Sequence, residues 1–136
     1  MVNDGRYWSG AHTKHRMLYH IVWIPKYRKR ILKGEIADRI KELLEECAAV
    51  NSWKIDELSI NADHIHMLIQ LRPDKSLSKV VQLFKRKSSY IIRKEFPDLK
   101  EFYWGGANSS FWSDGFFVET VGQVNEAKIK EYIQNQ

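Results

Sequence analysis

Residues 53–71 read WKIDELSINADHIHMLIQL, and this stretch decides the fold. It contains two runs of alternating, β-branched-rich sequence, 53–60 and 63–71, joined across Asn61 and Ala62. Because asparagine tolerates turn geometry, the pattern predicts an antiparallel hairpin. In the second run Ile65, Met67 and the following apolar residues alternate with polar ones. That face, which on an ideal strand also includes Asp63, should meet helices, whereas the face that carries the histidines should be an outer or cleft face. Asp63 is therefore expected to face away from the histidines and is not a candidate ligand.

The flanking sequence supplies five further elements. Residues 17–24 form a β-rich run that stops at Pro25, and apolar residues recur at helical spacing over 36–50. Ser76 can cap a second helix that ends before Pro97, a fourth strand is expected around 116–120, and Asn125 can cap a last helix. The order predicts an α+β fold of the split βαβ, ferredoxin-like or RRM-like plan. Its antiparallel sheet has two helices on one face plus a C-terminal helix.

Length and composition set outer limits on the protein. The 136 residues fit one domain, 1–136, whose first 15 residues form an irregular lead-in. A single cysteine, Cys47, excludes an internal disulfide scaffold and a zinc ribbon, and its apolar surroundings place it in the core. The sequence has no apolar run of membrane-spanning length and no signal peptide, which predicts a cytoplasmic protein without a membrane partner.

His64 and His66 are the most informative pair of polar residues. They lie two positions apart on a predicted strand, so they project from the same face with Cα atoms ~6.6 Å apart. Two neutral imidazoles at that separation can converge on a divalent cation, although spacing alone equally allows two solvated histidines. Two ligands make an incomplete site, so a further ligand must come from elsewhere in the chain.

Positive charge is concentrated in two segments of a chain whose formal net charge is +5. Residues 75–94 contain no acidic residue, which favours a positive helix face that binds phosphates, although a solvated surface is the alternative. A second basic cluster with an aromatic residue follows the first strand, a mixture that suits unstacked single strands. The candidate nucleic-acid contacts are Lys26, Tyr27, Arg28, Lys29, Arg30, Lys79, Lys85, Arg86, Lys87 and Arg93.

The run from Asn61 to Leu68 resembles the histidine, bulky hydrophobic, histidine motif of the HUH single-strand DNA nucleases. The wider pattern resembles the single-tyrosine transposases of bacterial and archaeal insertion sequences, called transposase A. It covers nearly the whole chain from His20 onward and closes with Tyr132, Ile133 and Gln136, which match that family's terminal tyrosine and glutamine. The ordered set is far more specific than an isolated histidine pair.

The resemblance implies a role for each matched residue. His64, His66 and Gln136 would hold Mg²⁺ or Mn²⁺, and Tyr132 would be the nucleophile that forms a 5′-phosphotyrosine and releases a 3′-hydroxyl. The implied substrate is single-stranded DNA with hairpins near the ends of the element. The implied assembly is a homodimer in which Tyr132 acts in trans, with residues 122–124 as a hinge.

Two other functions fit the same residues. The first is a noncatalytic single-stranded nucleic-acid-binding module on the same fold, in which Tyr132 and metal would not affect binding. The second is a domesticated tyrosine nuclease of palindromic repeats, which has the same chemistry. On helical spacing alone, Tyr132 is more readily explained as a packing residue at the edge of the last helix.

Overall fold

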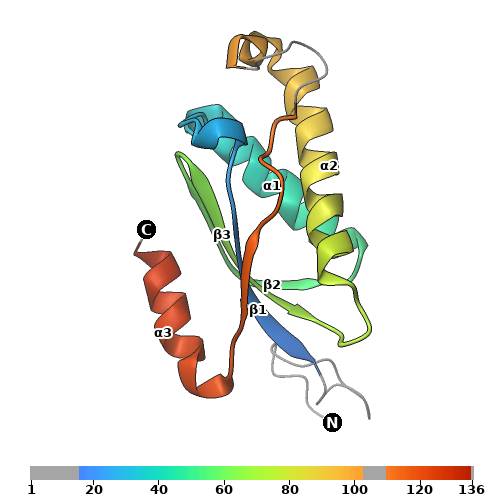
Figure 1. Cartoon of the computed structure of the whole chain (residues 1–136), viewed down its shortest axis with the longest axis vertical. Coiled ribbons are helices and arrows are strands. Elements are labelled where there is room, and N and C mark those ends of the chain that lie inside the picture. The colour runs from blue at the N-terminus through green and yellow to red at the C-terminus, as the bar shows by residue number, and fades with distance from the viewer. Residues whose placement is uncertain (1–15, 103–109, 136) are drawn as a thin grey trace.

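The computed structural model describes residues 16–102 and 110–135, and a four-stranded antiparallel sheet forms its centre (Figure 1). The strands are β1 (Met17–Trp23), β2 (Lys54–Asn61), β3 (His64–Leu71) and β4 (Phe117–Thr120). Their order in the sheet is β2-β3-β1-β4, and every neighbouring pair is antiparallel. The predicted α+β split βαβ fold is therefore confirmed.

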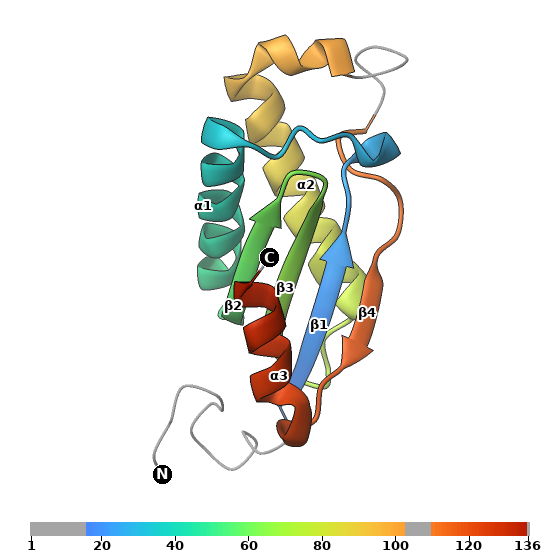
Figure 2. The same cartoon turned by 90° about the vertical axis from the view of Figure 1, so that its left-hand side faces the viewer.

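The helices divide between the two faces of this sheet. Helices α1 (Gly34–Val50) and α2 (Leu77–Glu95) cover one face, and α3 (Gln123–Gln134) crosses the other, as the turned view shows (Figure 2). Two short 3-10 helices, η2 (Lys26–Arg28) and η3 (Pro97–Phe102), follow β1 and α2. Within the described ranges, no helix has the length and apolar composition needed to cross a bilayer.

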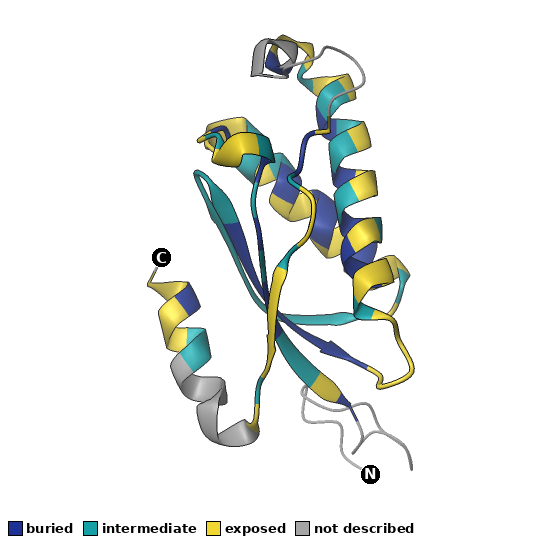
Figure 3. Cartoon of the chain, viewed as in Figure 1, coloured by how far each residue is buried: buried dark blue, intermediate teal, exposed yellow. Residues whose placement is uncertain are grey.

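The main core lies between the sheet and the α1–α2 layer, where buried residues line the inner sides of both helices (Figure 3). The Trp23 and Phe84 rings stack with centroids 6.0 Å apart, which ties β1 to α2. Cys47 is buried in this core as predicted, and burial raises the pKa of its thiol. The inward-facing residues of β3 are Ile65, Met67, Ile69 and Leu71, all fully buried.

The hairpin turn and the start of α3 differ from the sequence-based expectation. The hairpin turn lies at Ala62 and Asp63, one residue later than expected, because Asn61 still pairs with His64. Helix α3 begins at Gln123 after Gly122 rather than being capped by Asn125. The proposed hinge at 122–124 is therefore wrong in its extent, because residues 123 and 124 already belong to the helix.

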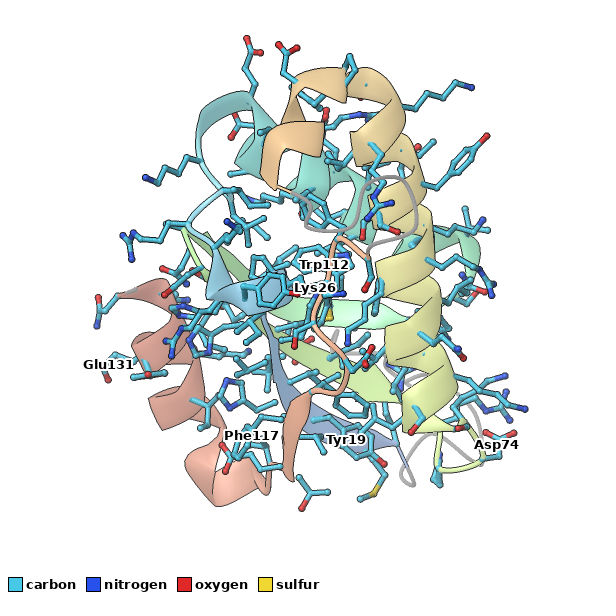
Figure 4. The ribbon with its side chains drawn as sticks, turned by 45° about the horizontal axis from the view of Figure 1, so that its top comes forward. Tyr19, Lys26, Asp74, Trp112, Phe117 and Glu131 are labelled. Atoms are coloured by element: carbon cyan, nitrogen blue, oxygen red, sulfur yellow. The ribbon has the colours of Figure 1, made fainter. Side chains whose placement is uncertain are left out.

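Helix α3 is held to the sheet by few described contacts. It packs against β2 and β3, and Ile133 is the one buried side chain among its described residues. Gln134 Nε2 donates a hydrogen bond to Glu57 Oε1 of β2 at 2.8 Å. Glu131 points away from the sheet (Figure 4). Among its described residues, α3 is held to the sheet by this apolar anchor, this hydrogen bond and the contact of Tyr132 with His66.

Replacing Ile133 with alanine should release α3 without unfolding the sheet. A buried Ile→Ala change costs about 2–5 kcal/mol, which is at least roughly a 30-fold shift in a local opening equilibrium. We expect hydrogen exchange of the α3 amides to accelerate by that factor while the amides of β3 keep their protection. Glu131→Ala is the control on the same helix and should leave both unchanged. Equal exchange of α3 in Ile133→Ala and wild type would contradict the anchor role.

Candidate active site

His64 and His66 lie together on the face of the sheet that α3 crosses. Their ring centroids are 4.7 Å apart and the ring planes are nearly perpendicular, at 82°. His66 is buried, with 5% of its surface exposed, while the His64 side chain keeps 20%. Strand alternation turns both rings away from the α1–α2 core, as the sequence pattern predicted.

Tyr132 of α3 contacts this histidine pair at His66. Its ring makes an edge contact with the His66 ring, with centroids 5.4 Å apart and planes 86° apart. Tyr132 is nevertheless 52% exposed, whereas its neighbour Ile133 is buried against the sheet. A phenol in contact with His66 thus remains accessible to a large substrate.

Asp63 fixes the orientation of the His64 ring. Its Oδ1 accepts a hydrogen bond from His64 Nδ1 at 2.7 Å, and its Oδ2 accepts one from Arg28 Nε at 3.1 Å. The hydrogen bond from His64 is the main influence that lowers the pKa of the Asp63 carboxyl, and the Arg28 charge acts in the same direction. The expectation that Asp63 faces away is wrong, because Asp63 belongs to the turn, where strand alternation does not apply.

The basic loop after β1 therefore reaches the histidine pair. Arg30 lies 3.8 Å from the same Asp63 carboxylate. Tyr27 and Arg28 both adopt left-handed backbone conformations, with φ of 60° and 51°, which non-glycine residues rarely occupy. The hydrogen bonds Lys26 N to Phe111 O and Arg28 N to Pro25 O hold this turn in place. Pro25 also forms an isolated β-bridge with Trp112, and Figure 4 labels Lys26 and Trp112 in this part of the fold.

His20 belongs to the site although its isolated position in the sequence did not single it out. Its Nε2 lies 3.1 Å from His66 Nδ1, and its Nδ1 lies 3.0 Å from Glu119 Oε1. His20 is directly opposite Glu119 in the β1–β4 ladder and diagonal to His66 in the β1–β3 ladder. The split βαβ plan, which places the first and third strands side by side, was the signal that would have found it.

The donor set of this site fits part of a divalent metal centre. A carboxylate only accepts hydrogen bonds, so His64 carries its proton on Nδ1, and its lone pair for a cation is on Nε2. The described residues contain no cluster of three or more His, Cys, Asp or Glu side chains placed around one metal position. Gln136, the third ligand implied by the family resemblance, lies outside the described residues.

The basic residues of α2 are not brought to the histidine pair, because α2 lies on the opposite face of the sheet (Figure 1). Arg86 and Arg93 line a groove of about 740 Å³ between α2 and residues 110–116. Lys79 and Lys87 are exposed on the same helix. Lys85 differs, because its ammonium donates to the carbonyl oxygens of Ser113 and Gly115, and burial lowers its pKa. Its described contacts hold the 113–115 segment.

Comparison with known proteins shows one family. Residues 13–136 match the family model described as "Transposase IS200 like". The chain is 40% identical over 128 residues to the transposase for insertion sequence element IS200 of Salmonella typhimurium, covering 94% of this chain and 82% of that protein. It is 32% identical to the ISDra2 transposase TnpA of Deinococcus radiodurans, covering 94% and 89% of the two chains.

Solved structures agree with this relationship. A crystal structure of a Deinococcus radiodurans protein assigned as a transposase has a TM-score of 0.74 and 31% identity, covering 95% of this chain and 97% of that one. A REP-associated tyrosine transposase bound to a REP hairpin shares the fold, with a TM-score of 0.63, 13% identity, and coverage of 93% and 68%. The resemblance to single-tyrosine HUH transposases is confirmed, and the chain belongs to the IS200-like transposase family of DNA-processing enzymes.

Proposed function

We propose that this transposase cleaves and rejoins single-stranded DNA by transesterification at Tyr132. The observation that carries the proposal is the contact between the half-exposed Tyr132 ring and His66, which supports a site in which the proposed nucleophile lies beside the histidine pair. In the cleavage step, Tyr132 Oη attacks phosphorus, and an Oη–P bond replaces the P–O3′ bond. The phenol loses one proton and the leaving 3′ oxygen takes up one, so the step is balanced. The products are a 5′-phosphotyrosine and a 3′-hydroxyl.

The same balance explains rejoining without ATP. The phosphotyrosine bond conserves one phosphodiester, so a different 3′-hydroxyl can attack it, restore a P–O3′ bond and return the proton to Tyr132. Hydrolysis would break the phosphotyrosine bond without joining two strands, whereas strand transfer uses that bond to form the new phosphodiester. The proposal therefore covers both the nuclease and the strand-transferase steps with one residue.

We propose His64 and His66 as ligands for Mn²⁺ or Mg²⁺, with Gln136 as the third ligand that the family resemblance implies. When bound, such a cation would polarise the scissile phosphate and stabilise the charge on the leaving 3′ oxygen. Nitrogen ligands suit Mn²⁺ better than the harder Mg²⁺, so Mn²⁺ should bind more tightly. Asp63 supports the pair by holding His64 in a fixed orientation.

The proposed DNA contacts fall into two groups. The loop residues Lys26, Tyr27, Arg28, Lys29 and Arg30 lead to Asp63 and His64, so they suit the strand that is cleaved. The exposed cations of α2 suit a DNA hairpin, since phosphates are neutralised by such a surface regardless of sequence. The hairpin bound by the REP-associated tyrosine transposase, which shares the fold, makes this class of partner the first to test.

Replacing Tyr132 with phenylalanine should abolish covalent chemistry but keep DNA binding. Full-length wild type and Tyr132→Phe are incubated with end-labelled single-stranded DNA from the element ends, with Mn²⁺ or Mg²⁺, and analysed by denaturing electrophoresis. We expect a metal-dependent protein adduct in wild type that falls by at least ~10³-fold in the variant, because no other hydroxyl replaces the nucleophile. Tyr90→Phe, an exposed tyrosine on α2, is the matched control and should retain the adduct.

An adduct that persists in Tyr132→Phe would contradict the proposed nucleophile. Tight binding by wild type without adduct or cleavage would favour the noncatalytic binding module. A domesticated nuclease of palindromic repeats would behave like a transposase in this assay. The DNA that flanks the gene distinguishes the transposase of an insertion sequence from such a domesticated nuclease.

We further propose a homodimer in which Tyr132 acts in trans. In the described chain α3 lies on its own sheet, and exchange of α3 between two copies would conserve each of its contacts at low cost. Ile133, the one buried side chain among the described residues of α3, favours such an exchange.

Mixing two inactive variants tests the arrangement. Tyr132→Phe and His66→Ala chains, co-refolded in equal amounts, form heterodimers in half of all dimers, and each heterodimer has one complete site if Tyr132 acts in trans. Adduct formation should then recover to about a quarter of the wild-type level, as expected for random pairing of exchanged subunits. No recovery in verified heterodimers would show that Tyr132 acts on the histidines of its own chain.

A further inference from the structure

Three side chains from three strands form a continuous hydrogen-bonded row beside the candidate metal site. Glu119 of β4 contacts His20 of β1 at 3.0 Å, and His20 contacts His66 of β3 at 3.1 Å. The His20 and His66 ring planes are only 5° apart, which suits a hydrogen bond between ring nitrogens. Both imidazoles are buried, with 5% of each residue exposed. The two buried imidazoles hold each other in one geometry, and Glu119, whose side chain is 47% exposed, is the solvent end of the row.

The order of donors and acceptors along the row determines which nitrogen of His66 carries the proton. The Glu119 carboxylate only accepts, so His20 Nδ1 donates to it. A neutral His20 then has a lone pair on Nε2 and accepts from His66 Nδ1. His66 in turn has its lone pair on Nε2, the nitrogen on the side of the ring away from His20.

We propose that His20 and Glu119 are positioning residues, which hold His66 in the Nδ1-protonated form and so direct its Nε2 to the divalent cation. This inference rests on the proposed metal-assisted function, because it assigns the partners of one proposed ligand. It gives the two histidines equivalent support: Asp63 accepts directly from His64, and Glu119 acts on His66 through His20. Such partners of ligating histidines typically change metal affinity by 10–100-fold.

A competing explanation is that the row only stabilises the sheet. Buried hydrogen bonds between strands contribute to folding whether or not His66 binds a metal. The two explanations differ in their consequence for His20→Gln. A glutamine can place Oε1 near the position of Nε2 and accept from His66 Nδ1, whereas His20→Phe fills the space without an acceptor.

The test measures Mn²⁺ binding by full-length protein in a Tyr132→Phe background without DNA, by calorimetry and by electron paramagnetic resonance. We expect His20→Phe to weaken Mn²⁺ binding by about 10–100-fold and His20→Gln to stay within about threefold of the parent. Glu119→Ala should weaken it by about 3–10-fold, because one intervening ring separates Glu119 from the ligand. Thr120→Ala, next to Glu119 on β4, is the control and should have no effect.

A second measurement needs no metal and protects the test against a misfolded variant. Nitrogen-15 NMR of the histidine side chains in the metal-free parent should show His66 protonated on Nδ1, assigned by comparison with His66→Ala. A His66 ring protonated on Nε2 would overturn the proposal. Equal Mn²⁺ affinity of His20→Phe and the parent would also overturn it.

These outcomes separate the inference from the proposed function. If His66→Ala abolishes Mn²⁺ binding and His20→Phe leaves it intact, the metal site stands and the positioning role fails. If the parent itself binds no Mn²⁺, the proposed metal-assisted function fails and the positioning role fails with it. Loss of binding in His20→Phe with retention in His20→Gln supports both.

Discussion

The register of β3 against its two neighbours is the constraint on which the rest of the structure depends. His66 pairs with Val22 of β1 and with Ser59 of β2, so Ile65 and Met67 enter the α1–α2 core while the histidines face α3. A slip of one residue would exchange the two sets, burying imidazoles among apolar side chains. The alternation of β3 that places apolar side chains in the core therefore also places the histidines on the opposite face of the sheet.

The two faces of the sheet have separate tasks. The inner face, with α1 and α2, supplies a large apolar core. The outer face carries a row of hydrogen-bonded side chains on the side that α3 crosses, and among the described residues of α3 only Ile133 is buried there. The tyrosine of the proposed mechanism thus lies on a helix that few described contacts hold to the sheet, which suits an element that meets a large substrate or a second copy.

Much of the fold could be predicted from the sequence, because its signals are local. The alternation over 63–71, the helical spacing over 36–50 and the Ser76 cap each specify an element without reference to the rest of the chain. The errors occurred where a local signal was weak: the turn moved by one residue, and α3 began before its expected cap. The error in the position of the turn had the larger consequence, because it led to the wrong expectation that the Asp63 side chain faces away from His64.

The site was predicted only as far as residues close in sequence or matched to a family motif. His64 and His66 are two residues apart, so strand geometry alone brings them together. His20 and Glu119 are far from them in sequence, and their role depends on the order of strands in the sheet. For Lys85 the charge pattern predicts a DNA contact. In the tertiary structure its ammonium instead donates hydrogen bonds to two backbone carbonyl oxygens. The DNA contact stays a prediction.

The central claim is that the histidine pair and Tyr132 form one metal-binding catalytic site. Paramagnetic broadening by Mn²⁺ tests it most directly, because the effect falls steeply with distance from the ion. Substoichiometric Mn²⁺ added to the full-length protein should broaden the side-chain resonances of His64, His66 and Tyr132 together, while Tyr90 on α2 stays sharp. Broadening of the histidines with a sharp Tyr132 signal, or broadening centred on another part of the chain, would contradict the account.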